Sequence, residues 1–93
     1  MSLLWENEFE TCALNLEKNF PQFDFDQEDE RITVYTCKGI LLINWHSVAN
    51  QIWVSSPITG AHHFFYDQEE WKNTRTKIIF KEQIIQELNI LNA

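Results

Sequence analysis

The segment from Asn50 to Gly60 constrains the fold of this chain more than any other stretch. Its residues alternate between aliphatic side chains and side chains that are polar or aromatic, namely Ile52 and Val54 against Gln51, Trp53 and Ser55. A period of two residues is typical of a strand with one buried face. Pro57 and Gly60 favour a turn directly afterwards. The sequence therefore predicts a half-buried strand at about residues 50–55.

Trp53 is the unusual residue of this strand, because its side chain points away from the core if the aliphatic residues face it. Gln51 and Ser55 would share that outer face. A tryptophan in such a place either packs against a cross-strand neighbour, such as His63 or Trp45, or is offered to a binding partner. The residues alone leave both alternatives open.

The other elements follow from periodicity and from turn residues. Apolar residues at helical spacing predict one helix at about residues 3–19, which Pro21 ends, and another from about Ile79. The segment Asn73–Lys77 is predicted to be a loop. Short apolar runs separated by turns predict strands at about residues 23–26, 32–34, 40–44, 50–55 and 62–66, and around Trp71.

A helix, five or six short strands and a second helix form the pattern of an α+β fold. We therefore expect a two-layer α/β sandwich, in which the N- and C-terminal helices pack on one face of a five- to six-stranded antiparallel sheet. The other face of the sheet would meet water. A chain of 93 residues is long enough for one core, so a single domain is expected over residues 1–93.

The charge of the chain is unevenly distributed. Residues 1–30 contain nine acids and one lysine, whereas residues 31–93 contain five acids and six bases. Nucleic acid is therefore an unsuitable partner for the N-terminal region, because phosphate contacts need Lys and Arg. Cations and basic protein surfaces suit it better. No apolar run approaches the roughly 20 residues that span a bilayer, so no membrane partner is expected.

The N-terminal segment Met1–Glu10 contains acids but no Arg or Lys, which is not typical of a signal or transit peptide. A cytoplasmic protein of bacterial type fits, and so does a protein of the mitochondrial matrix or a related organelle whose presequence is absent. Cys12 and Cys37 show no metal-ligand spacing. We interpret them as free thiols in a reducing compartment.

Three acids of the first predicted helix share one stripe. Glu6, Glu10 and Glu17 fall within about 40° of one another on a helical wheel. With a rise of about 1.5 Å per residue, Glu6 and Glu10 are about 6 Å apart along the axis, and Glu10 and Glu17 about 10 Å. One ion cannot be chelated by all of them. Two interpretations stay open: a solvated face without a ligand, or a surface that binds several hard cations weakly.

The three histidines give no dedicated metal site. His62 and His63 are adjacent, so they point to opposite faces of a regular strand. No Cys or carboxylate completes a zinc spacing with them or with His46. The sequence also contains no nucleophile elbow, phosphate loop or metalloprotease helix, so no catalytic residue is predicted.

The run Gln-Ile-Trp-Val-Ser-Ser-Pro at residues 51–57, with Gly60 three residues further on, resembles the central signature of the frataxin family. Asn44 lies nine positions before Trp53, which is the family's spacing for an asparagine that closes the preceding strand. Trp71 matches the second family tryptophan. The resemblance covers nearly the whole chain, and frataxins have the sandwich architecture that the periodicity predicts.

The resemblance implies an iron site, because frataxins bind iron on the acidic first helix and first strand. The matching positions are Glu6, Glu10, Glu17, Asp24 and Asp26. Frataxins place the first strand next to the first helix, so Asp24 and Asp26 would lie close to the helical acids, and Glu28, Asp29 and Glu30 would extend this acidic surface through the turn. It implies weakly bound Fe²⁺ or Fe³⁺ and no organic cofactor. Bacterial frataxins usually carry further acids at the end of the first helix, where this chain has Lys18, Asn19 and Pro21. The resemblance therefore implies that this chain binds less iron than bacterial frataxins usually do.

The resemblance also implies partners, because frataxins engage the complex of cysteine desulfurase and iron–sulfur scaffold protein. The partner-binding positions would be Asn44, Gln51, Trp53, Ser55 and His63. The implied function is to supply iron to cluster assembly or to regulate it. The alternatives are an acidic protein-interaction module with incidental metal binding and an iron-oxidising storage oligomer. We expect a monomer that is not an enzyme, although iron-dependent oligomers and ferroxidase activity have been credited to the family.

Overall fold

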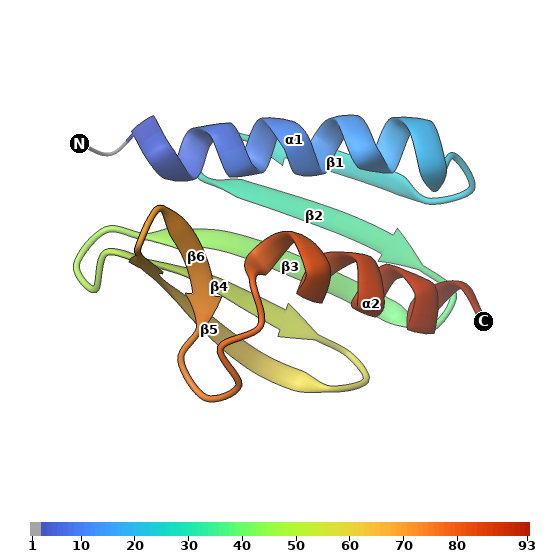
Figure 1. The fold of residues 1–93 in the computed structure, drawn as a ribbon. Coiled ribbons are helices and arrows are strands. Elements are labelled where there is room, and N and C mark those ends of the chain that lie inside the picture. Colours follow the sequence, from blue (N-terminus) through green and yellow to red (C-terminus); the bar gives the residue numbers. More distant parts are fainter. Residues whose placement is uncertain (1–2) are drawn as a thin grey trace.

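A computed structural model describes residues 3–93 and shows two helices on one face of a six-stranded antiparallel sheet (Figure 1). Each strand pairs with the next one along the chain, so short turns are sufficient to connect them. The elements are α1 (Leu3–Asn19), β1 (Asp24–Glu28), β2 (Arg31–Thr36), β3 (Gly39–His46), β4 (Gln51–Ser56), β5 (Gly60–Asp67), β6 (Glu70–Asn73) and α2 (Phe80–Asn92). The predicted two-layer α+β sandwich is confirmed.

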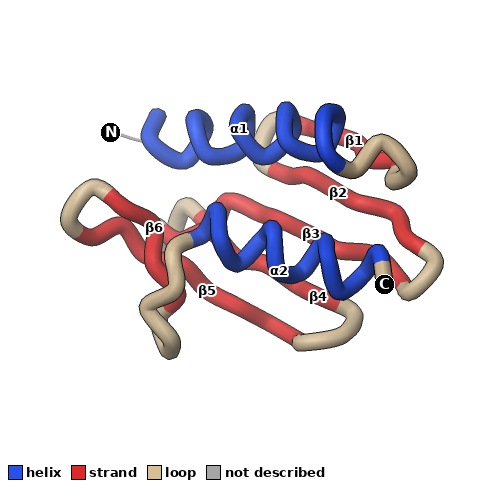
Figure 2. The backbone as a smooth tube through the Cα atoms, turned by 45° about the vertical axis from the view of Figure 1, so that its right-hand side comes forward, coloured by secondary structure: helices blue, strands red, loops and turns tan. Residues whose placement is uncertain are grey.

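Both helices cover the same face of the sheet, with α1 over the β1 and β2 side and α2 beside it (Figure 2). The core lies between these layers. The fully buried apolar side chains of the sheet are Ile32, Val34, Leu41, Ile43, Ile52, Val54 and Phe64. They meet the apolar stripes of the helices, which include Phe9, Leu16, Phe80, Ile84 and Leu88. Periodicity places these stripes correctly because each helix buries one face only.

An aromatic cluster closes one end of the core. Trp5 of α1 stacks on Trp45 of β3, with ring centroids 5.2 Å apart and an interplanar angle of 6°. Trp71 of β6 meets Trp45 edge-on at 5.9 Å. Trp45 therefore lies on the helix face of the sheet and is not a neighbour of Trp53. The indole N–H of Trp5 is buried without an acceptor among residues 3–93.

Neither helix in residues 3–93 has the length and apolar character needed to cross a membrane. The open face of the sheet, opposite the helices, carries the outer residues of the strands. Trp53 of β4 is among them, as the alternation along that strand predicts.

Candidate functional site

Acidic side chains from α1 and from the turn between β1 and β2 line one groove, which we name the acidic groove. Its volume is about 630 Å³. Glu6 and Glu10 come from α1, whereas Glu28 and Asp29 come from the end of β1 and the turn. None of the described residues that line it is basic. Glu6 is half-buried and the other acids are exposed, so the carboxylates stay in contact with water.

Asp24 and Asp26 lie on the face of β1 that points away from the core and from α1. They alternate with Phe25, which packs against the core, and Asp24 is opposite Tyr35 in the register of β1 and β2. The Asp26 carboxylate accepts a hydrogen bond of 2.9 Å from the Tyr35 hydroxyl. This hydrogen bond raises the pKa of Tyr35, and desolvation and nearby negative charges add to the effect. The structure thus places these two acids apart from the acidic groove.

Glu17 is exposed on α1, two helical turns beyond Glu10, and does not line the acidic groove. Within residues 3–93, no three His, Cys, Asp or Glu side chains lie close enough to hold one metal ion together. The acids implied as iron ligands are therefore distributed over three places: the groove, the later turns of α1 and the outer face of β1. Of the predicted set, the groove brings together only Glu6 and Glu10, and the turn adds Glu28 and Asp29.

The predicted partner-binding residues share the open face of the sheet. Asn44, Trp53 and His63 occupy one cross-strand row, because the register pairs Trp53 with each of the other two. Gln51 lies two residues before Trp53 and accepts a hydrogen bond of 2.8 Å from its indole N–H. Ser55 is exposed one row further along β4. The predicted placement of these side chains on one face agrees with the structure, and their role in partner binding stays a prediction.

Trp53 is packed between two imidazole rings. The His46 ring stacks on one face of the indole at 3.8 Å between centroids, and the His63 ring covers the other face at 4.3 Å. The interplanar angles are 12° and 11°. A partner can therefore reach the edge of the indole and the outer faces of the imidazoles. His63 was one of the neighbours that the sequence suggested; His46 was missed, although it is directly opposite Gln51 in the register.

A buried polar network under α2 was also missed. Glu87 is 1% exposed and accepts hydrogen bonds from Gln83 Nε2 at 3.0 Å and from the Thr59 hydroxyl at 2.8 Å. The Thr59 oxygen also lies 2.8 Å from His62 Nε2. Because the Thr59 proton points to Glu87, His62 Nε2–H is the donor in this contact. Asn73 Nδ2 then donates to His62 Nδ1 at 3.3 Å.

The sequence contained a signal for this network. Gln83 and Glu87 stand three and seven residues after Phe80, so they lie on the apolar stripe of α2. Polar side chains at core positions need partners, because an unsatisfied buried polar group is costly. His62 faces α2 and His63 the open face, which confirms that the two rings point in opposite directions.

Residues 4–91 match the family described as the Frataxin-like domain. The chain is similar to frataxin from Psychromonas ingrahamii, of the CyaY protein family, with a TM-score of 0.79 and 20% identity over 89% of this chain and 79% of that one. A trimeric frataxin of the yeast Saccharomyces cerevisiae, complexed with ferrous iron, has a TM-score of 0.81 and 19% identity over 95% and 85% of the two chains. Another trimeric yeast frataxin, with full-length N-terminus, has a TM-score of 0.75 and 20% identity over 94% and 74%.

Proposed function

Since this chain belongs to the family of frataxin-like domains, we propose that it binds iron weakly on the acidic surface of α1 and the β1–β2 turn. It would supply this iron to iron–sulfur cluster assembly or use it to regulate that process. The acidic groove is the observation that carries the proposal, because four carboxylates line it and no basic residue does. The solved yeast relative complexed with ferrous iron adds support.

The donor set of the groove suits iron as a cargo. Carboxylate oxygens are hard ligands, which favour hard and borderline cations such as Fe³⁺ and Fe²⁺. Since no three ligands converge within residues 3–93, each ion would be held by one or two carboxylates and completed by water. Such ions exchange readily with solvent. Easy exchange is what a protein that transfers iron needs.

Docking on the complex of cysteine desulfurase and scaffold protein is the second part of the proposal, and it rests on the family resemblance. The acids of α1 would face a basic surface and steer the encounter. The edge of Trp53 and the outer faces of His46 and His63 would make the short-range contacts. The steering part would weaken with salt, because exposed charges are screened within about 10 Å at 0.1 M ionic strength.

The iron part is tested by anaerobic calorimetric titration with Fe²⁺. The double variant Glu6→Gln, Glu10→Gln removes two charges from the groove, whereas Glu70→Gln, Glu82→Gln removes two exposed charges elsewhere. We expect the first variant to bind fewer ions or to bind them at least about threefold more weakly, as loss of a direct ligand requires. Equal losses in both variants would show that only net charge matters, and would contradict a groove site.

The docking part needs a separate measurement of partner affinity. Charge reversal of Glu10 and Glu17 to Lys is expected to weaken binding to the desulfurase complex, mainly through the association rate and mainly at low salt. Trp53→Ala should raise the dissociation rate at every salt concentration. If charge reversal abolishes partner binding and leaves Fe²⁺ binding unchanged, the chain is an acidic interaction module and iron is incidental.

An iron-oxidising storage oligomer is a second candidate, favoured by the trimeric form of the yeast relatives. It predicts that particles grow as iron is added in air. Light scattering after size-exclusion chromatography would detect this growth. An unchanged mass at excess iron would exclude storage by assembly, and would leave the carrier proposal intact.

A further inference from the structure

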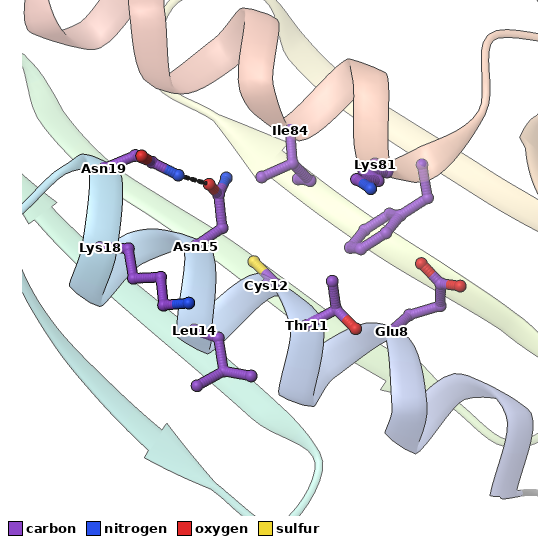
Figure 3. A pocket seen from close by; sticks show the side chains of 10 residues that line it. Glu8, Thr11, Cys12, Leu14, Asn15, Lys18, Asn19, Lys81 and Ile84 are labelled. Carbon is purple, nitrogen blue, oxygen red and sulfur yellow. Dashed lines mark hydrogen bonds between the residues drawn. The ribbon is translucent and has the colours of Figure 1, made fainter.

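A second groove lies between α1 and α2, and its charge is opposite to that of the acidic groove (Figure 3). Its volume is about 230 Å³. The charged residues of its lining are two lysines, Lys18 and Lys81, and one acid, Glu8. This lining is positive in a protein whose net charge is −7. An anion that the rest of the surface repels would therefore be tolerated here.

The floor of the groove is apolar. Cys12, Phe80 and Ile84 line it, and each is at least nine-tenths buried. Burial and the charge of Glu8 raise the pKa of the Cys12 thiol to about 12, so this side chain is a neutral thiol that behaves as a small hydrophobe. A hydrocarbon group laid on this floor would remove mainly its own apolar surface from water, because the floor side chains are already buried.

The two ends of the groove differ. Glu8 and Lys81 lie at one end (Figure 3). Desolvation raises the pKa of Glu8, and the positive charge of Lys81 partly offsets that rise. The ammonium of Lys81 is thus already near a carboxylate. This end offers a ligand little additional charge.

The other end holds Asn15, Lys18 and Asn19 (Figure 3). Lys18 forms no salt bridge within residues 3–93. The Asn19 amide donates to the Asn15 side-chain oxygen. This contact does not use the Asn15 NH₂ group, which can therefore donate to a ligand. An ammonium and an amide donor beside an apolar floor are the groups that recognise a carboxylate at the end of a hydrocarbon chain.

We propose that this groove binds a small amphipathic carboxylate of the medium-chain fatty acid class. Its hydrocarbon part would lie on Cys12, Phe80 and Ile84, and its carboxylate would contact Lys18 and Asn15. The volume is below the range of about 300–1,000 Å³ that is common for drug-sized ligands, so the ligand must be short. Apolar burial would supply most of the affinity, and the ammonium would fix the direction of the chain.

Octanoate below its micelle-forming concentration is the probe, followed by ¹⁵N NMR of the backbone amides. We expect shifts confined to the lining segments of α1 and α2. Octylamine has the same chain and the opposite charge, so it should bind at least about threefold more weakly. Shifts that scatter over the exposed apolar residues, such as Val48 and Ile58, would overturn the proposal, and so would equal binding of both probes.

Two variants locate the site. Lys18→Gln is expected to weaken octanoate binding about threefold to tenfold, because a charge-assisted hydrogen bond is lost. Lys77→Gln removes another exposed lysine, which lies outside the groove, and should leave affinity unchanged. Thr11→Trp, at an exposed lining position, should block the groove. Equal affinities of Lys18→Gln and Lys77→Gln would refute the site, as would self-association that shifts the same amides without any ligand.

Discussion

At the level of single residues, the two cysteines have opposite environments. Cys12 is 6% exposed and its pKa is raised to about 12, whereas Cys37 is exposed. Because the thiolate is the reactive form, we expect iodoacetamide at mildly alkaline pH to modify Cys37 in the folded protein and Cys12 only after unfolding. Intact-protein mass spectrometry should show one adduct without denaturant and two with it. Two adducts formed at equal rates in the folded protein would contradict the burial of Cys12.

The two glycines provide a matched pair of substitutions. Gly39 has φ +130°, and a Cβ there would lie 2.7 Å from Pro57 Cβ. Gly60 has φ +92° with nothing within 4 Å of such a Cβ. Both alanine variants adopt a strained backbone, which costs about 1–2 kcal/mol. Only Gly39→Ala adds a clash, so we expect it to lower the free energy of unfolding by about 2–4 kcal/mol.

Urea unfolding of both glycine variants measures this difference. Similar losses of stability in Gly39→Ala and Gly60→Ala would mean that the structure around Gly39 and Pro57 can shift to relieve the clash without a loss of stability. A larger loss in Gly60→Ala would contradict the packing of these turns.

At the level of elements, the polar network attaches α2 to the sheet. Glu87 connects α2 to Thr59 of the β4–β5 turn, and Gln83 is hydrogen-bonded to Asn73 of β6. Removing the Glu87 carboxylate leaves the buried Gln83 Nε2 without its acceptor, and the exposed Thr59 hydroxyl loses its bond to α2. We expect Glu87→Ala to lower the free energy of unfolding by about 2–4 kcal/mol.

Glu82 supplies the control for this prediction, because it is exposed on the same helix. Glu82→Ala should change stability by less than about 0.5 kcal/mol. Chemical denaturation of both variants makes the comparison. Equal stabilities would show that the network contributes nothing to the attachment of α2, and that the apolar contacts of Phe80, Ile84 and Leu88 are sufficient.

The sequence predicted the helices and strands better than it predicted how the side chains of the candidate site are arranged. Periodicity places Phe9 and Ile84 on the buried faces of helices and Ile52 on the buried face of a strand, because each element buries one side. The stack of His46 on Trp53 depends on the strand register and on ring orientation, which no single segment encodes.

The acids illustrate the same limit. The helical wheel groups Glu6, Glu10 and Glu17, and Glu28 and Asp29 were expected to extend that surface through the β1–β2 turn. The structure brings four of these acids together but leaves Glu17 outside the groove, because the groove lies where the turn meets α1. The alternation with Phe25 had already put Asp26 on the side of β1 away from the core. Since both helices were expected on the core face, that side was also expected to be the open face of the sheet, and the structure shows α1 on the opposite side from Asp26.

For the whole molecule, the two grooves divide the surface by charge. The acidic groove joins α1 to the β1–β2 turn, and the groove with Lys18 and Lys81 lies between α1 and α2. α1 contributes to both with different faces. The open sheet face with Trp53 is a third surface on the other side of the sheet. A cation and a small anion would thus bind on different surfaces, whereas a protein partner would use the open face together with α1 acids such as Glu10 that also line the acidic groove.

Iron binding at the proposed site, the acidic groove, is tested most directly by an anaerobic Fe²⁺ titration that NMR follows residue by residue. We predict that paramagnetic broadening begins at the amides of Glu6, Glu10, Glu28 and Asp29, and reaches Glu17 only as more iron is added. The exposed acids Glu69 and Glu70, at the β5–β6 turn, should stay sharp. Broadening that starts at Glu69 and Glu70, or signals of the groove that stay sharp with iron in large excess, would contradict the proposal.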